Sequence, residues 1–234
     1  MTPLSDATLY GIIDLGYVTA DEAPDAAREL LAGGVGVLQL RAKRAERALI
    51  RDLAGEIAPL CRGVQVPFVL NDHPELVEET GADGVHVGQD DVSVARAREI
   101  VGANRIVGLS THSLDQVRAA IECVPDYIGF GPLFSTATKP DYLPIGLADV
   151  AEANRIAPFP VFCIGGIKRE NLPQILEAGA RRVVIVSGLL EARDRTAYAR
   201  ECRILLNPRK PKSATATTSN PVGAGSGITA RMRL

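Results

Sequence analysis

The chain has 234 residues, a formal net charge of −2, 46 % hydrophobic residues and only 4 % aromatic residues, with no tryptophan. This length accommodates one α/β barrel or two small domains. The near-neutral charge gives no electrostatic basis for binding DNA, RNA or an anionic membrane, and the scarcity of aromatic rings argues against stacking on nucleic-acid bases.

Eight short apolar runs recur along the chain at similar intervals, with helical stretches between them. The runs are Leu9–Ile13, Val37–Leu40, Phe68–Leu70, Val85–Val87, Ile106–Leu109, Tyr127–Phe130, Val161–Ile164 and Val183–Val186. Short, continuously apolar runs are typical of parallel strands that are covered on both faces. Eight strand–helix units in about 200 residues predict one α/β domain, a (β/α)8 TIM barrel over residues 1–206. A doubly wound open sheet is the alternative, but it usually has fewer strands, and no Gly-rich dinucleotide turn follows the first run.

Helix boundaries are marked by residues that favour the start or the end of a helix. Three predicted strands follow a glycine that would close the preceding helix, in the segments LLAGGVGVLQL, EETGADGVHV and LEAGARRVVIV. Pro24 and Pro74 stand where first helical turns are expected. In the helix predicted over Glu46–Cys61, one face is apolar and consists of Leu49, Ile50, Leu53, Ile57 and Leu60.

The last segment, residues 207–234, differs in composition from the rest of the chain. It has five basic residues and no acidic ones, and it is rich in Ser, Thr, Ala, Gly and Pro without apolar periodicity. This composition predicts a disordered basic tail. The absence of a signal-peptide pattern and of any apolar run long enough to cross a bilayer predicts a cytoplasmic protein. Four cysteines form no CxxC pair and are expected to be small buried side chains, namely Cys61, Cys123, Cys163 and Cys202.

Two acidic residues follow successive predicted strands in the segment VLNDHPELVEETGADGVHVGQDD, residues 69–91. Asp72 comes just after the third strand and Asp91 soon after the fourth. Because neighbouring parallel strands end at the same edge, their carboxylates can converge although nineteen residues separate them. Enzymes commonly hold Mg²⁺ with one or two carboxylates, while waters and substrate phosphate complete the coordination. The segment therefore predicts a Mg²⁺ site and a phosphorylated or diphosphorylated substrate.

Polar residues also follow other strands on this edge. Gln39, Arg41 and Lys43 alternate at the end of the second strand and would share one face. One amide and two cations suit an anionic group with a polar ring beside it. Asn71 and Ser110 follow the third and fifth strands.

A second group of candidate residues follows the last three strands. The long loop after the sixth strand, GPLFSTATKPDYLPIG, carries Thr136, Thr138 and Lys139, and such a loop more often covers a substrate than merely connects elements. The seventh strand ends in Gly165-Gly166 and the eighth in Ser187-Gly188, where backbone N–H groups, a short helix N-terminus and a hydroxyl can hold a phosphate. The barrel mouth is thus expected to hold a diphosphate and a monophosphate, which is typical of an enzyme that joins two phosphorylated molecules.

Taken in order, seven segments of the chain resemble the thiamine-phosphate synthase family. They are VLQLRAK (37–43), VLNDH (69–73), GADGVHVGQDD (81–91), VGLSTHS (107–113), YIGFGPLFSTATK (127–139), CIGGI (163–167) and VVIVSG (183–188). The resemblance covers nearly all of residues 9–206. It implies a Mg²⁺-dependent transferase that joins 4-amino-2-methyl-5-hydroxymethylpyrimidine diphosphate to 4-methyl-5-(2-hydroxyethyl)thiazole phosphate, or its carboxylated form, and releases diphosphate.

The resemblance also implies roles for individual residues. The pyrimidine diphosphate would contact Gln39, Leu40, Arg41, Ala42, Lys43, Asn71, Ser110 and Lys139. The thiazole phosphate would contact Thr136, Ala137, Thr138, Gly166, Val186 and Ser187. Asp72 and Asp91 would bind Mg²⁺. The residues implied in catalysis are Arg41, Lys43, Ser110 and Lys139, with the cations stabilising charge on the departing diphosphate.

Two other functions stay open. A thiazole tautomerase of the same barrel family could use His112 as a base and should lack the second metal carboxylate, so Asp91 and the Thr136–Lys139 segment favour the synthase. A non-catalytic thiamine-phosphate-binding barrel should have lost a metal ligand or a cation, and neither is lost. The expected partners are two phosphorylated small molecules, with no nucleic acid and no membrane, and a homo-oligomer is left open. Asp14 has no assigned role. His86 is interpreted as structural, and His73, next to Asp72, as a residue that supports the metal ligand without binding the metal itself.

Overall fold

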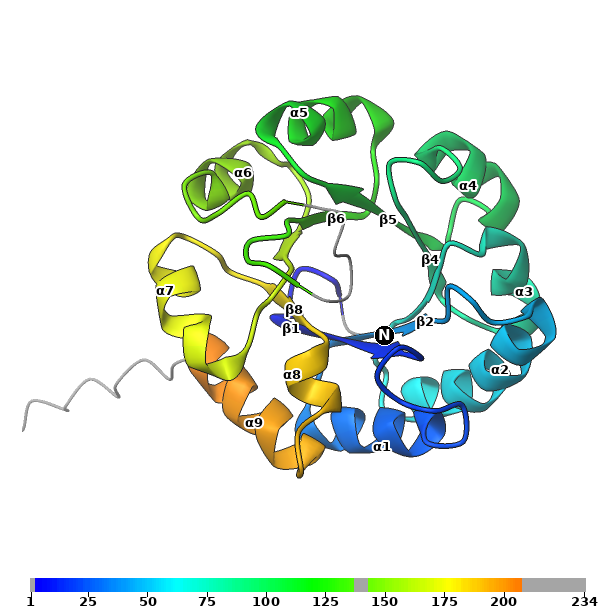
Figure 1. Ribbon diagram of the computed structural model, residues 1–234. Helices are drawn as coiled ribbons and strands as arrows, with labels where there is room; N and C mark the ends of the chain where they lie inside the picture. The colour runs from blue at the N-terminus through cyan, green and yellow to red at the C-terminus, as the bar shows by residue number, and fades with distance from the viewer. Residues whose placement is uncertain (1–2, 137–142, 208–234) are drawn as a thin grey trace, which may run out of the picture.

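The computed structural model describes residues 3–136 and 143–207 (Figure 1). Eight parallel strands form a closed barrel in chain order, and β1 pairs with both β2 and β8. The strands are β1 Leu9–Asp14, β2 Val37–Arg41, β3 Phe68–Asn71, β4 Gly84–Val87, β5 Ile106–Thr111, β6 Tyr127–Phe130, β7 Val161–Cys163 and β8 Val183–Ile185. The predicted (β/α)8 barrel is confirmed, and each predicted strand is present with ends that differ by at most two residues.

Helices surround the barrel on its outer side (Figure 1). The α-helices are α1 Ala23–Gly33, α2 Arg47–Gly63, α3 Val77–Thr80, α4 Val94–Val101, α5 Leu114–Cys123, α6 Val150–Ile156, α7 Leu172–Glu177, α8 Ser187–Leu190 and α9 Arg195–Leu206, and two short 3-10 helices are η1 Pro74–Leu76 and η2 Arg169–Asn171. The ring closes where α9 lies against α1, since Arg195 Nη1 is 2.9 Å from Glu29 Oε2 and the Thr196 hydroxyl donates to the Glu29 carbonyl.

The predicted helix boundaries are largely confirmed. Pro24 and Pro74 lie in the first turns of α1 and η1. Gly34, Gly81 and Gly179 have φ values of 90°, 70° and 98°, the left-handed conformation that commonly ends a helix.

Two expectations about burial are wrong. Leu49 was assigned to the apolar face of α2, but it is exposed, because the helix buries Ala54, Ala58 and Cys61 beside its larger apolar residues. Cys123, at the carboxyl end of α5, is exposed as well, whereas Cys61, Cys163 and Cys202 are buried as expected.

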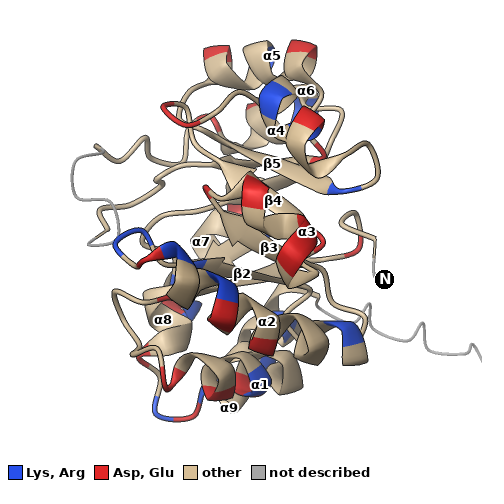
Figure 2. Ribbon diagram, turned by 90° about the vertical axis from the view of Figure 1, so that its right-hand side faces the viewer, with Lys and Arg blue, Asp and Glu red and all other residues tan. Residues whose placement is uncertain are grey.

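The outer surface carries both charge signs mixed over the helices (Figure 2). Several exposed ion pairs link successive turns of one helix, such as Arg96–Glu99 at 2.8 Å and Arg118–Asp115 at 2.8 Å. Each such pair contributes only about 0.3–0.5 kcal/mol. No helix within residues 3–136 and 143–207 combines the length and the apolar character needed to cross a membrane. The predicted tail lies outside the described residues from position 208 onward.

Buried apolar side chains of the described residues form two cores. The larger one lies between the strands and the helices, and it contains the outward-facing side chains of the strands. The smaller one fills the barrel, and its members include Tyr10, Tyr127 and Phe162. The Tyr10 and Tyr127 rings each meet Phe162 edge-on, with centroids 5.4 and 5.5 Å apart. Three aromatic rings from β1, β6 and β7 thus fill the barrel interior beneath the carboxyl ends of the strands.

Gly108 on β5 makes room for one of these rings. A Cβ atom at this position would overlap the Tyr127 ring. We therefore expect Gly108→Ala to lower the free energy of unfolding by about 1–3 kcal/mol, the usual effect of an added carbon in a filled core. Urea denaturation measures this change. Gly55→Ala is the control, because no atom lies within 4 Å of a Cβ at Gly55 in α2, and equal losses in the two variants would contradict the packing argument.

Candidate active site

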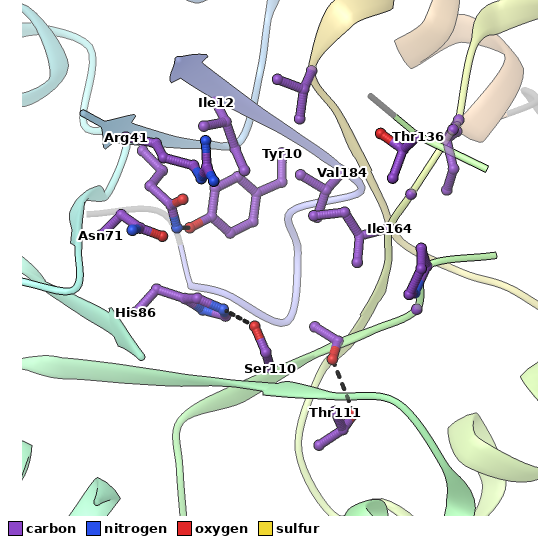
Figure 3. Close-up of a pocket in the computed structure, with 18 of the residues that line it drawn as sticks. Tyr10, Ile12, Arg41, Asn71, His86, Ser110, Thr111, Thr136, Ile164 and Val184 are labelled. Atoms are coloured by element: carbon purple, nitrogen blue, oxygen red, sulfur yellow. Dashed lines mark hydrogen bonds between the residues drawn. The ribbon is translucent and has the colours of Figure 1, made fainter. Parts of the chain in front are cut away.

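A pocket opens at the carboxyl ends of the strands (Figure 3). Its empty volume is about 890 Å³, counting the open solvent at its mouth, which is within the size range of small-molecule sites. Figure 3 shows Ile12 of β1, Arg41 of β2, Asn71 of β3 and Ser110 of β5 around it. The opposite wall is formed by residues that follow β6, β7 and β8, namely Pro132, Thr136, Ile164, Gly165, Gly166, Ile167, Val186 and Ser187.

Arg41 is held in the pocket wall by a buried carboxylate. Its Nη1 lies 2.6 Å from Asp14 Oδ2, and the two side chains are only 14 % and 4 % exposed. Asp14 Oδ1 also accepts a hydrogen bond of 2.9 Å from the Gly16 amide. Because β1 and β2 pair with Asp14 beside Arg41, Asp14 acquires a role that the sequence did not reveal, which is to orient the guanidinium toward the ligand space.

Asp72 and Asp91 converge, as predicted. Burial raises the pKa of Asp72, and the neighbouring Asp91 carboxylate raises it further, whereas Lys43 opposes the shift. Lys43 Nζ lies 3.4 Å from Asp72 Oδ2. Asp91 Oδ2 accepts a hydrogen bond of 2.7 Å from the Gly88 amide, which turns the loop after β4 so that its carboxylate faces Asp72.

This pair of carboxylates fits a divalent cation. Burial and, after it, the neighbouring Asp91 carboxylate both disfavour the charged form of Asp72 and raise its pKa, and a bound cation would favour the charged form of both carboxylates. The residues described in 3–136 and 143–207 contain no group of three or more His, Cys, Asp or Glu side chains suited to a metal. Two carboxylates match Mg²⁺, which keeps several waters and takes phosphate oxygens as ligands, better than they match an ion that requires a full protein cage.

Glycine is required on the opposite side of the pocket. Gly165 and Gly166 have φ values of 97° and 64°. A Cβ at Gly166 would come within 2.7 Å of Phe134 Cβ and of the Ser135 carbonyl oxygen, so the loop after β7 packs directly on the loop after β6. Asn171 donates to the Gly166 carbonyl at 2.9 Å. Together with Ser187, which begins α8, these residues form a polar backbone wall.

The structure brings most of the predicted site residues to this pocket. Those that line it are Gln39, Arg41, Asn71, Ser110, Thr136, Gly166, Val186 and Ser187. Lys43, Asp72 and Asp91 form a cluster in the loops that follow β2, β3 and β4, beside Asn71. Ala137, Thr138 and Lys139 lie outside the described residues.

The side chains of Leu40 and Ala42 face away from the pocket, contrary to the expectation that they contact the pyrimidine diphosphate. Both are buried in the core between the barrel and the helices, because alternate residues of a strand point to opposite faces. Their side chains do not line the pocket, so only their backbone atoms are available to a ligand.

The histidines differ in their surroundings. His112 lines the pocket, and its Nδ1 is hydrogen-bonded to the Gly131 carbonyl, as expected for a structured loop histidine. His73 Nδ1 lies 3.3 Å from Glu75 Oε1. His86 was interpreted as structural, yet it lines the pocket together with Tyr10 and Tyr127. These two tyrosines were not predicted as pocket residues, because both stand in apolar runs.

Known proteins resemble this chain over most of its length. The family model described as thiamine monophosphate synthase matches residues 9–189. Thiamine-phosphate synthase from Chloroflexus aurantiacus is 36 % identical over 209 residues, covering 89 % of this chain and 96 % of the relative. The corresponding protein from Persephonella marina is 38 % identical over 186 residues, covering 80 % and 89 %. The solved structure of thiamine phosphate pyrophosphorylase from Pyrococcus furiosus has a TM-score of 0.78 at 28 % identity and covers 86 % of this chain and 96 % of that one.

Proposed function

The chain belongs to the thiamine monophosphate synthase family, and on that premise we propose that it joins a pyrimidine diphosphate to a thiazole phosphate. The substrates would be 4-amino-2-methyl-5-hydroxymethylpyrimidine diphosphate and 4-methyl-5-(2-hydroxyethyl)thiazole phosphate or its carboxylated form. The products would be thiamine phosphate and diphosphate, together with CO2 when the carboxylated form is the substrate. The observation that supports this most directly is one pocket with a cationic and acidic wall after β2–β4 and a glycine-rich wall after β7 and β8.

The first wall suits the pyrimidine diphosphate. Gln39 and Asn71 offer amide groups to the polar ring, and Ser110 offers a hydroxyl. Arg41 and Lys43 supply positive charge for the diphosphate, and Lys139 is proposed as a third cation from the sequence alone. These cations would stabilise the negative charge that develops as the C–O bond to the diphosphate breaks.

Asp72 and Asp91 would hold Mg²⁺ between the protein and the diphosphate. When bound there, Mg²⁺ would neutralise part of the charge on the leaving group. Lys43 contacts Asp72 at 3.4 Å, so its ammonium lies beside the carboxylate that would hold the metal. The cationic side chain is therefore positioned to share the same diphosphate.

The second wall suits the thiazole phosphate. Thr136 and Ser187 carry hydroxyls, and the left-handed Gly165-Gly166 turn brings the backbone to the pocket surface. The ring nitrogen of the thiazole would attack the methylene carbon from which diphosphate departs. That nitrogen has no proton to lose, so the reaction needs no general base at this point, and His112 is not required for one.

Replacing Gly166 with alanine is expected to weaken the binding of thiazole phosphate by about tenfold or more, because the new methyl group would displace Phe134 and the Ser135 backbone. Gly102→Ala is the matched control. Gly102 also has a positive φ of 88°, but no atom lies within 4 Å of a Cβ there. Both variants carry backbone strain, and only Gly166→Ala should change the dissociation constant measured by calorimetry. Equal affinities in the two variants would remove this turn from the phosphate site.

The proposed function is tested by incubating the purified protein with both substrates and Mg²⁺ and following thiamine phosphate and diphosphate by mass spectrometry. Formation of both products in equal amounts, dependent on each substrate and suppressed by EDTA, is the expected result. Isomerisation of a thiazole carboxylate phosphate without any coupling would instead identify a tautomerase. Tight binding of thiamine phosphate without turnover would identify a non-catalytic binding protein.

A further inference from the structure

A continuous chain of hydrogen bonds crosses the barrel through residues that line the pocket. Gln39 Nε2 lies 2.8 Å from the Tyr10 hydroxyl, and that hydroxyl lies 2.9 Å from the hydroxyl of Tyr127. The Tyr127 hydroxyl is 3.0 Å from His86 Nδ1, and His86 Nε2 is 2.9 Å from Ser110 Oγ. Figure 3 shows Tyr10, His86 and Ser110 on this path. The chain links the second, first, sixth, fourth and fifth strands.

Few protons are available for these hydrogen bonds. Their number restricts which partner donates and which accepts in each bond, and therefore the direction in which the hydrogen-bond chain runs. Each hydroxyl has one proton to donate, and a neutral imidazole has one N–H. Burial raises the pKa of both tyrosines well above the ordinary value, so both phenols keep their protons. A buried phenol proton without an acceptor is costly, so both tyrosines must donate within this set of hydrogen bonds. If the Gln39 amide nitrogen donates to Tyr10, then Tyr10 donates to Tyr127, and Tyr127 donates to His86 Nδ1. His86 then carries its proton on Nε2 and donates to Ser110.

The opposite direction is the only other complete arrangement with a neutral imidazole. It requires the Gln39 amide oxygen to accept from Tyr10, and it requires Ser110 to donate to His86 Nε2. In that arrangement Ser110 presents only lone pairs to the pocket. A phosphate oxygen is also an acceptor, so this direction would place two acceptors face to face.

We propose that the chain runs from Gln39 to Ser110 and that His86, Tyr127 and Tyr10 are positioning residues. They orient the Ser110 hydroxyl as a donor toward the diphosphate. They also link that end to Gln39, whose amide oxygen remains an acceptor for an amino group on the ring. The chain thereby couples recognition of the ring at Gln39 to recognition of the leaving group at Ser110. This inference takes its ligands from the proposed function. The direction of the hydrogen bonds can be measured in the ligand-free protein.

The packing around the chain fixes its geometry. The His86 and Tyr127 rings are stacked, with centroids 5.5 Å apart and an interplanar angle of 29°. Gly108 leaves space for Tyr127, and a Cβ at Gly129 would lie 3.6 Å from His86 Cε1. Tyr127 is fully buried and its ring also meets Tyr10 and Phe162, so its hydroxyl remains the bridge between the two halves.

The test combines a tautomer measurement with kinetics. Tyr127→Phe removes the bridging hydroxyl and keeps the ring, and Tyr10→Phe interrupts the chain one step earlier. Tyr198→Phe is the control, because its hydroxyl accepts from the Arg169 amide and does not line the pocket. The ¹⁵N resonances of His86 in ligand-free protein are identified by their loss in His86→Gln, since the sequence contains only three histidines.

In the wild type and in Tyr198→Phe, we expect a protonated Nε2 and an unprotonated Nδ1. Tyr127→Phe and Tyr10→Phe should both show a mixture of His86 tautomers. Their kcat for coupling should fall by about tenfold, as for the loss of one well-formed hydrogen bond, while KM for the pyrimidine diphosphate changes by less than about threefold.

A wild-type His86 protonated on Nδ1 would overturn the proposed direction. A tautomer that is unchanged in both variants would show that the chain does not set it. A changed His86 tautomer together with a wild-type kcat would show that these hydrogen bonds do not affect the reaction. If the wild-type protein makes no thiamine phosphate, the proposed function fails, and the tautomer measurement still decides the direction of the chain.

Discussion

Replacing Asp91 with asparagine is expected to lower thiamine phosphate formation by at least about 10²–10³-fold at low millimolar Mg²⁺. The amide oxygen of asparagine can still accept from the Gly88 amide, which now donates to Asp91 at 2.7 Å, so the loop after β4 should keep its shape. What is lost is one of the two negative charges that would hold the cation. The affinity for thiazole phosphate should change little, because Gly166 and Ser187 lie on the opposite wall.

Asp90→Asn is the matched control, since it removes one charge from the neighbouring exposed position. Binding of Mn²⁺ as a spectroscopic probe, followed by competition with Mg²⁺, measures the site directly. We expect Asp91→Asn to weaken Mn²⁺ binding and to regain part of its activity at high Mg²⁺, whereas Asp90→Asn should match the wild type in both. Full activity of Asp91→Asn at low Mg²⁺ would remove Asp91 from the mechanism.

The position of the carboxylate pair was predictable because it depends mainly on topology. In a barrel of parallel strands every carboxyl end lies on the same face, so residues that directly follow two successive strands must be neighbours. Asp72 directly follows β3, and Asp91 lies a few residues beyond β4, where the hydrogen bond from the Gly88 amide turns the loop toward Asp72. The same reasoning correctly placed Asn71, Ser110 and Gly166 at the pocket.

The contents of the barrel interior were not predictable in this way. Tyr10 and Tyr127 stand in continuously apolar strands, where the sequence does not reveal which alternate residues face inward. Once the structure assigns the faces, Leu40 is seen to point outward and Gln39 inward. The ion pair between Asp14 and Arg41 joins residues that are 27 positions apart, and it depends on the register of two strands, which the pattern of residues did not determine.

Removing Arg41 should damage the protein in two separable ways. Arg41→Ala takes the guanidinium from the diphosphate wall, and we expect kcat/KM for the pyrimidine diphosphate to fall by about 10²–10³-fold. It also leaves the Asp14 carboxylate, 4 % exposed, without its counter-charge. Breaking a buried pair from one side costs about 3–5 kcal/mol of folding free energy. Steady-state kinetics and urea denaturation measure the two effects independently.

The double variant Arg41→Ala/Asp14→Asn separates these contributions. Asparagine is neutral, so no unpaired charge is left in the interior, and its side-chain oxygen can still accept from the Gly16 amide. Most of the lost stability should therefore return. Turnover should not return, because the cation that faces the diphosphate is still missing. Arg195→Ala is the control, since it breaks the Arg195–Glu29 pair on the helical ring, away from the pocket, and should leave turnover unchanged. Recovery of both stability and turnover in the double variant would mean that Arg41 serves only to neutralise Asp14, and the diphosphate would then have to be bound by the remaining cations.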